Sequence, residues 1–193
     1  MNDSTNPRAL THAGKHTTIR TELLTLIPAA AYHVRAELAG NAAIGTLLDA
    51  EIPVSWPPGQ YDRDAQEFFL QALEAGGDDA IGWFGWYAIK RASDSERAVL
   101  VGCGGYFGPP SENGTVEIGY SVCPEWCGRG YATDLARALV DHALQLSEVV
   151  RVIAHTNDDN PASIAVLRRS GFQQAAISDQ PGALLFEWAN SDR

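Results

Sequence analysis

The chain has 193 residues, 45% of them hydrophobic and 20% charged, which is typical of one soluble globular domain. Its net charge of −10 argues against a nucleic-acid partner, because nonspecific binding to nucleic acid requires a basic face. The three cysteines give no disulfide framework, and no second Cys or His cluster completes a zinc site beside Cys123 and Cys127. We therefore expect a reducing compartment and no metal.

The first residues are polar and lack the apolar segment of a signal peptide. No run approaches the ~18 apolar residues that a membrane span requires. We therefore expect a flexible N-terminal tail over residues 1–18, one domain over residues 19–193, no membrane association and a cytoplasmic location.

The first part of the chain alternates between periodic apolar segments and Pro/Gly-rich turns. The predicted elements are, in order, a strand over residues 22–27, a helix from Pro28 to Gly40, an ambiguous helix or loop over 41–51, a loop over 52–62 and a helix over 64–75. The loop contains three prolines and two aromatic residues, Trp56 and Tyr61.

The second part of the chain begins with three strand-like runs joined by short turns, which favours an antiparallel arrangement. The predicted elements are strands over residues 81–91, 96–107 and 115–122, a helix over 129–146, a strand over 149–155, a helix over 162–170 and closing strands over 172–177 and 183–188. Asn160 is expected to cap the last helix, with Pro161 at its first position. The order of elements predicts a mixed α/β fold.

A strand followed by a glycine-rich turn and a helix is an arrangement that binds anionic groups. Here the strand over residues 115–122 leads to Gly128-Arg129-Gly130 and then to an apolar helix. The first N–H groups of a helix have no intrahelical partner, and its dipole adds positive charge at that end. The spacing alone also fits an ordinary helix start, and it matches neither a Walker loop nor a dinucleotide fingerprint.

Two blocks of the sequence resemble the GNAT N-acetyltransferases. VEIGYSVCPEWCGRGYATDLARALVDHAL (residues 116–144) resembles their acetyl-CoA-binding segment, with the pattern Gln/Arg-x-x-Gly-x-Gly/Ala at residues 127–132. Cys127 stands where Gln or Arg is usual, which weakens one side-chain contact to the pyrophosphate. HTNDDNPASIAVLRRSGF (residues 155–172) resembles their Asn-x-x-Ser…Gly-Phe segment, in a form closest to the Rim-type ribosomal-protein N-terminal acetyltransferases.

This resemblance implies a GNAT fold, with a central, mostly antiparallel sheet splayed between its fourth and fifth strands and flanked by helices. It also implies acetyl-CoA as the cofactor, with its pantetheine arm in the gap of the sheet and its pyrophosphate on the glycine-rich loop. The residues expected to bind the cofactor are Ile118, Tyr120, Ser121, Val122, Cys127, Gly128, Arg129, Gly130, Tyr131, Ala132, Asn160 and Ser163. Asn160 has a second interpretation, as a helix cap alone.

The same resemblance suggests two catalytic residues. Glu117 lies on the splayed strand, where related enzymes often hold a general base, although strand alternation also allows an outward surface charge. Ser163 is a candidate to protonate the departing thiolate, because Leu167 occupies the position of a tyrosine in many relatives; solvent is the alternative donor.

Other reactive or aromatic side chains have simpler interpretations. Cys123 and Cys127 are less favoured as acyl-carrying nucleophiles, because no histidine is placed in sequence to activate them. His155 is expected to have a structural role. A set of aromatic residues is expected to lie in the core rather than along the acceptor side: Trp56, Tyr61, Trp83, Trp86 and Tyr106.

The function expected from the resemblance is acetyl transfer from acetyl-CoA to a primary amine by direct attack in a ternary complex. The acceptor is a protein or peptide N-terminus or a small amine. Removing a proton at pH 7 costs about 1 kcal/mol for an α-amine and over ~4 kcal/mol for the lysine side chain. This difference slightly favours α-amines as acceptors. A small-molecule or antibiotic-detoxifying acetyltransferase and a non-catalytic acyl-CoA sensor are the alternatives, and a homodimer is left open.

Overall fold

The computed structural model describes residues 17–175, 178, 180 and 182–189. Almost all of the predicted tail, residues 1–18, lies outside this range, as do Ala176 and Ile177 at the end of one predicted strand. Among the described residues, no helix is both long and apolar enough to cross a membrane.

The described strands join in one eight-stranded sheet with the order β1-β2-β3-β4-β5-β6-β8-β7. The strands are β1 (Ile19–Arg20), β2 (Leu24–Pro28), β3 (Gly85–Lys90), β4 (Val99–Tyr106), β5 (Thr115–Val122), β6 (Arg151–Asn157), β7 (Phe172–Gln174) and β8 (Ala183–Trp188). All neighbouring strands are antiparallel except β5 and β6, which are parallel. The predicted mixed α/β fold and the antiparallel arrangement of β3, β4 and β5 are confirmed.

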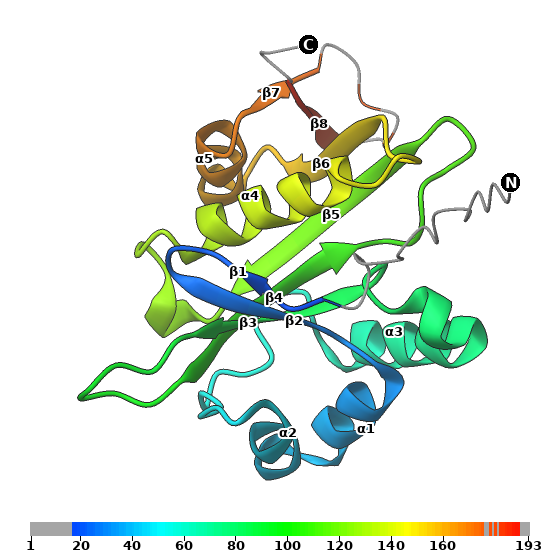
Figure 1. Cartoon of the computed structure of the whole chain (residues 1–193). Coiled ribbons are helices and arrows are strands. Elements are labelled where there is room, and N and C mark those ends of the chain that lie inside the picture. Colours follow the sequence, from blue (N-terminus) through cyan, green and yellow to red (C-terminus); the bar gives the residue numbers. More distant parts are fainter. Residues whose placement is uncertain (1–16, 176–177, 179, 181, 190–193) are drawn as a thin grey trace, which may run out of the picture.

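The helices cover the sheet on both faces, with α4 and α5 on one side and α1, α2 and α3 on the other (Figure 1). They are α1 (Ala31–Ala39), α2 (Asn41–Leu48), α3 (Arg63–Gly76), α4 (Tyr131–Leu144) and α5 (Pro161–Arg169), with short 3₁₀ turns η1 (Gly77–Ala80) and η2 (Pro124–Trp126). The stretch that the sequence left ambiguous, residues 41–51, is therefore mainly helical.

The sheet opens between β5 and β6. The first part of β5 pairs with β6, from Thr115 opposite Arg151 to Glu117 opposite Ile153. The second part of β5, residues 118–122, pairs only with β4 among the described strands. The expected splay between these two strands is confirmed, and it leaves half of β5 with a backbone edge facing the gap.

The first helix begins later than the sequence predicts. Pro28 ends β2 instead of opening the helix, because the backbone stays extended through Ala30. The Ala29 N–H donates to the Gly85 carbonyl at 2.8 Å, and the Ala30 N–H donates to Nδ1 of His33 at 3.1 Å. These two hydrogen bonds satisfy N–H groups ahead of the helix, so α1 begins at Ala31.

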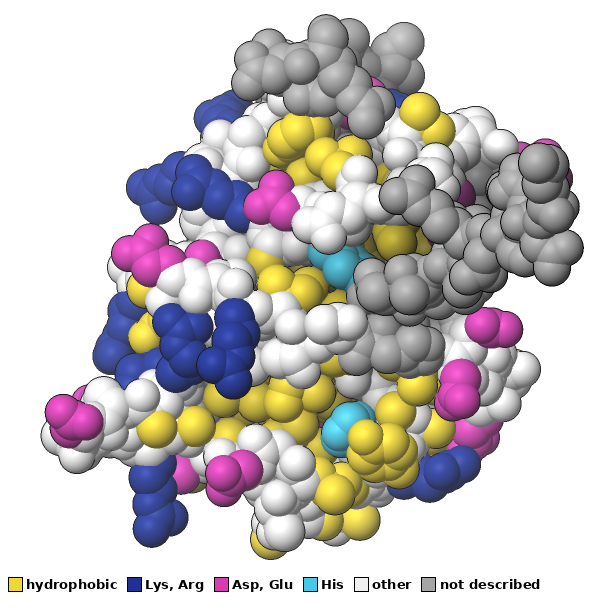
Figure 2. All heavy atoms as spheres, viewed as in Figure 1, with side chains coloured by type: hydrophobic (Ala, Val, Ile, Leu, Met, Phe, Trp, Pro, Cys, Tyr) yellow, Lys and Arg dark blue, Asp and Glu magenta, His cyan; other side chains and the backbone are white. Residues whose placement is uncertain are grey.

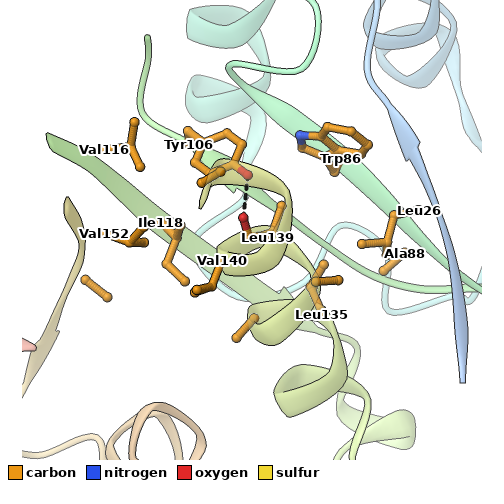
Figure 3. Packing of buried hydrophobic residues seen from close by; sticks show 14 of the residues in the cluster. Leu26, Trp86, Ala88, Tyr106, Val116, Ile118, Leu135, Leu139, Val140 and Val152 are labelled. Atoms are coloured by element: carbon orange, nitrogen blue, oxygen red, sulfur yellow. Dashed lines mark hydrogen bonds between the residues drawn. The ribbon is translucent and has the colours of Figure 1, made fainter. Parts of the chain in front are cut away.

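The larger core fixes α4 against β5. Leu135 and Leu139 on the inner stripe of α4 are fully buried, together with Val116 and Ile118 of β5 (Figure 3). The Tyr106 hydroxyl of β4 donates to the Leu139 carbonyl at 2.6 Å. Each buried leucine contributes about 1.5–3 kcal/mol relative to exposure, so this contact holds the start of α4 in a fixed relation to the open half of β5.

Candidate functional site

A cleft of about 780 Å³ runs along the open half of β5. Its lining residues come from β3, β4, β5 and β6, from α3, α5 and the start of α4, and from the loop over residues 52–62. The predicted site residues that line it are Glu117, Ile118, Tyr120, Ser121, Val122, Cys127, Gly128, Gly130, Tyr131, Ala132, Asn160 and Ser163. The cleft thus brings together the two sequence blocks identified above.

The glycine-rich turn before α4 is built for an anion. Gly128 and Gly130 have φ of 75° and 88°, a left-handed backbone that glycine adopts without strain. This conformation at Gly130 excludes it from the helix, so α4 begins at Tyr131 rather than at the predicted Arg129. Among the described residues no side chain caps α4, so the N–H groups of its first turn face the cleft without a side-chain partner from this part of the chain.

Arg129 is the exception among the predicted cofactor-binding residues, because it does not line the cleft. Its guanidinium lies over the Trp126 ring, 4.8 Å from the ring centroid, and the Lys90 ammonium lies 5.7 Å from the same ring. Lys90 also pairs with Glu96. In Figure 2, Lys and Arg side chains gather over the region where α4 begins. The turn therefore lies beside positive charge on a chain that is acidic overall.

Glu117 contacts an imidazole. Its Oε1 lies 2.8 Å from Nδ1 of His155 on β6, and the two side chains are 25% and 7% exposed. The alternative interpretation of Glu117 as an outward surface charge is therefore wrong. In a parallel ladder, Glu117 opposite Ile153 shares a face with His155 two residues on, which explains the contact. Nε2 of Gln180 lies 3.2 Å from the same imidazole nitrogen.

On the α5 side of the cleft, Asn160 caps the helix. Its Oδ1 accepts a hydrogen bond from the Ser163 N–H at 3.0 Å, which confirms the predicted cap. The Ser163 hydroxyl lies 3.3 Å from the hydroxyl of Tyr120, which reaches across from β5. Burial raises the pKa of Tyr120 to about 12, so this hydroxyl keeps its proton at neutral pH. Leu167, where relatives carry tyrosine, is fully buried in the core.

Sequence reasoning missed a buried carboxylate beneath the loop over residues 52–62. Glu37 of α1 is 6% exposed and accepts four hydrogen bonds. Oε1 accepts from Trp56 Nε1 at 2.7 Å and Gln66 Nε2 at 2.8 Å, and Oε2 accepts from the hydroxyls of Tyr61 at 2.9 Å and Tyr87 at 2.8 Å. Burial raises the pKa of Glu37 although these hydrogen bonds oppose the shift.

One sequence signal for Glu37 did exist. It lies three residues after Val34 and four after His33, and all three are buried on one face of α1. A carboxylate at helical spacing from core positions indicates a paired, buried charge.

The predicted aromatic set is mostly in the core. Trp56, Trp83, Trp86 and Tyr106 are buried, as expected, and Tyr61 is half-buried. Three of the five also line the cleft: Tyr61, Trp86 and Tyr106.

The cysteines differ in accessibility. Cys103 is buried in the core beside the cleft, and burial raises the pKa of its thiol. Burial also raises the pKa of Cys123, whereas Cys127 is exposed. Within the described residues, no three His, Cys, Asp or Glu side chains are grouped so that they could hold a metal ion. A raised pKa makes Cys103 and Cys123 poor nucleophiles.

Comparison with known proteins agrees with this geometry. A family model described as "Acetyltransferase (GNAT) domain" matches residues 24–173. An uncharacterized N-acetyltransferase, YjdG of Bacillus subtilis (strain 168), is 29% identical over 125 residues, covering 65% of this chain and 71% of that protein.

Two solved structures share the fold at low identity. RimL, a ribosomal-protein α-N-acetyltransferase in complex with coenzyme A, has a TM-score of 0.62 at 18% identity, covering 89% of this chain and 97% of its own. The microcin self-immunity acetyltransferase MccE, in complex with acetyl-CoA and AMP, has a TM-score of 0.56 at 16% identity, covering 86% and 92%.

Proposed function

Because the chain belongs to the GNAT acetyltransferase family, it is an acetyl-CoA-dependent N-acetyltransferase, and we propose that it acetylates a primary amine by direct attack in a ternary complex. The observation that carries this proposal is the open half of β5 beside the glycine-rich turn. The proposal treats residues 19–193 as one acetyltransferase domain, because the described strands all join one sheet.

In this proposal the cofactor lies along the cleft. The N–H groups at the start of α4, with Gly128 and Gly130, hold the pyrophosphate. Cys127 lines the same turn but adds no positive charge there, so the backbone and the nearby Arg129 supply the attraction. The pantetheine arm takes the place of a strand beside residues 118–122, and the β5 N–H groups polarise the thioester carbonyl.

Glu117 is the proposed general base. An amine must lose a proton before or during its attack, and a carboxylate in the cleft accepts that proton directly or through a water. The hydrogen bond between Glu117 and His155 means that the two side chains act as a pair, with the imidazole fixing the orientation of the carboxylate. Changes at the two residues are therefore expected to be non-additive.

Ser163 is the proposed donor to the departing thiolate. Its hydroxyl is within 3.3 Å of the Tyr120 hydroxyl, which holds its own proton at neutral pH because burial raises the pKa of Tyr120 to about 12. A proton given up by Ser163 is replaced from Tyr120 along this contact, and Tyr120 takes a proton from solvent in the cleft, so both hydroxyls end the cycle protonated. This pair supplies the role that a tyrosine at the position of Leu167 has in relatives.

The proposal is tested by release of free thiol from acetyl-CoA with a panel of peptide and small amines, alongside calorimetric measurement of acetyl-CoA binding. We expect binding and turnover. Glu117→Gln should lower kcat by about 100-fold while the Kd for acetyl-CoA changes by less than about twofold. Glu74→Gln, which alters an exposed carboxylate paired with Arg35, is the matched control and should leave both unchanged.

His155→Gln should also lower kcat, and the double variant should be no slower than the slower single variant. Binding of acetyl-CoA without turnover of any amine would favour a non-catalytic sensor instead. No binding of acetyl-CoA would overturn the proposal.

A further inference from the structure

The loop over residues 52–62 forms one wall of the cleft, on the face of the sheet that α1, α2 and α3 cover. Gly59, Gln60 and Tyr61 line the cleft, opposite residues of β3 and β4. With the pantetheine arm along residues 118–122 and the pyrophosphate at α4 on the opposite face of the sheet, the face that carries this loop is left for the acceptor amine.

The loop is held from below by Glu37. Trp56 in the middle of the loop and Tyr61 near its end both donate to this carboxylate. The same carboxylate binds Gln66 of α3 and Tyr87 of β3, so it joins the loop to a helix and a strand of the sheet. A buried carboxylate with four donors is rigid, because losing any one partner leaves a buried polar group unsatisfied.

The loop is also held against β5 and the turn that follows it. Gly59 has a φ of 59°, and a Cβ added there would lie 2.4 Å from the Ser121 Oγ of β5. The Ser55 hydroxyl donates to Oε2 of Glu125 in η2 at 2.6 Å. The loop therefore closes over the end of β5, so its inner surface borders the open half of that strand.

The inner surface of this wall is apolar. The hydroxyls of Tyr61 and Tyr87 are both used by Glu37, so each tyrosine presents its ring to the cleft. Phe69 of α3 packs against Tyr61 with the ring centroids 5.8 Å apart, and both line the cleft. Apart from His155, the charged side chains among the described lining residues are Glu117 and Arg169, and neither belongs to this wall.

We propose that Glu37 is a positioning residue for acceptor recognition, and that the wall it holds selects a single amine attached to an apolar or aromatic body over a polyamine. This inference rests on the proposed function. A polyamine would bring a second ammonium group against this wall, whose described lining residues include no carboxylate. The attraction between an ammonium group and aromatic rings is smaller than the cost of desolvating that ammonium group. An apolar body instead buries its surface against the rings of Tyr61 and Phe69.

The test compares phenethylamine with spermidine as acceptors at saturating acetyl-CoA, in the wild type and in three variants. Glu37→Ala removes the shared acceptor, and Glu37→Gln keeps its shape and can reorient the tyrosine hydroxyls. Tyr61→Phe removes one donor and keeps the ring in the wall, so it is the variant to rely on if Glu37→Ala does not fold. Glu74→Gln on α3 is again the matched control, and calorimetry follows acetyl-CoA binding throughout.

We expect the wild type to have a kcat/KM at least about tenfold higher for phenethylamine than for spermidine. This factor corresponds to the penalty for one polar group that is desolvated and left unpaired. Glu37→Ala should raise the KM for phenethylamine about tenfold or more, and Tyr61→Phe about threefold, because the wall loses its fixed position. Kd for acetyl-CoA should change by less than about twofold, and Glu37→Gln should restore KM to within about threefold of wild type.

Three results would overturn the inference while leaving the proposed function intact. They are a preference for spermidine, turnover of no aromatic amine by an enzyme that binds acetyl-CoA, and an unchanged acceptor KM in both Glu37→Ala and Tyr61→Phe. A purely structural role for Glu37 would instead lower kcat and acetyl-CoA affinity together without changing the ratio between the two acceptors. Loss of acetyl-CoA binding by the wild type counts against the proposed function.

Discussion

Asn160 combines a structural and a proposed cofactor-binding role, and two substitutions separate them. Its Oδ1 caps α5 through the Ser163 N–H at 3.0 Å, and the same residue lines the cleft. Asn160→Ala removes the cap, which costs about 1 kcal/mol, and in a domain of 150–250 residues this lowers Tm by about 2–4 °C. Asn160→Asp keeps an oxygen for the cap and favours the helix dipole, so Tm should not fall.

Both variants should nevertheless bind acetyl-CoA more weakly than wild type. Both lose the side-chain amide N–H₂ that we expect to face the cofactor, and one lost hydrogen bond of about 0.5–1.5 kcal/mol weakens Kd by about 2- to 13-fold. Thermal unfolding by circular dichroism gives Tm, and isothermal calorimetry gives Kd. If Asn160→Asp binds acetyl-CoA as tightly as wild type, Asn160 is a helix cap only, and its assignment to the cofactor site is wrong.

Three further outcomes follow from the same site. Gly128→Ala forces alanine into a left-handed backbone at a cost of about 1–2 kcal/mol and should weaken acetyl-CoA binding. Gly77→Ala at the end of α3 is the control: φ of 56° with ψ of −142° also strains alanine, in open space, so Tm should fall without a change in Kd. Because burial raises the pKa of Glu37, the stability that this group contributes is complete below its unfolded pKa and is lost as pH rises through its folded value. Urea unfolding should therefore show the stability of wild type relative to Glu37→Gln declining from about pH 4.5 upward, and a flat or rising difference would contradict this. Finally, iodoacetamide followed by mass spectrometry should label exposed Cys127 well before buried Cys103, and acetyl-CoA should protect Cys127; labelling at an unchanged rate would place the cofactor elsewhere.

The sequence predicts the local features of the site well. The strand over residues 115–122 has the predicted bounds, because an alternating run lies between a glycine turn and a proline. Asn160 and Pro161 mark the start of α5 as predicted, because capping depends on residues three or four apart. The start of α4 was missed by two residues, since only the backbone shows that Gly130 is left-handed.

Long-range contacts are what the sequence did not predict. Glu37 takes its donors from a loop, a helix and a strand that lie between 19 and 50 residues further along the chain. The pairing of Glu117 with His155 depends on the parallel register of β5 and β6, across 38 residues. Neither contact follows from periodicity, because each depends on how separate elements are packed.

The half of β5 without a partner on β6 also bears on how much of this protein persists in a cell. Under the proposed function, acetyl-CoA supplies the missing neighbour along residues 118–122 and binds only the folded chain. Cofactor at 100 times its Kd would then add about 2.7 kcal/mol to the free energy of unfolding, and correspondingly less chain would be open to proteases. The abundance of the enzyme would thus follow the cellular supply of acetyl-CoA, so that acetyl-CoA depletion removes catalyst as well as substrate.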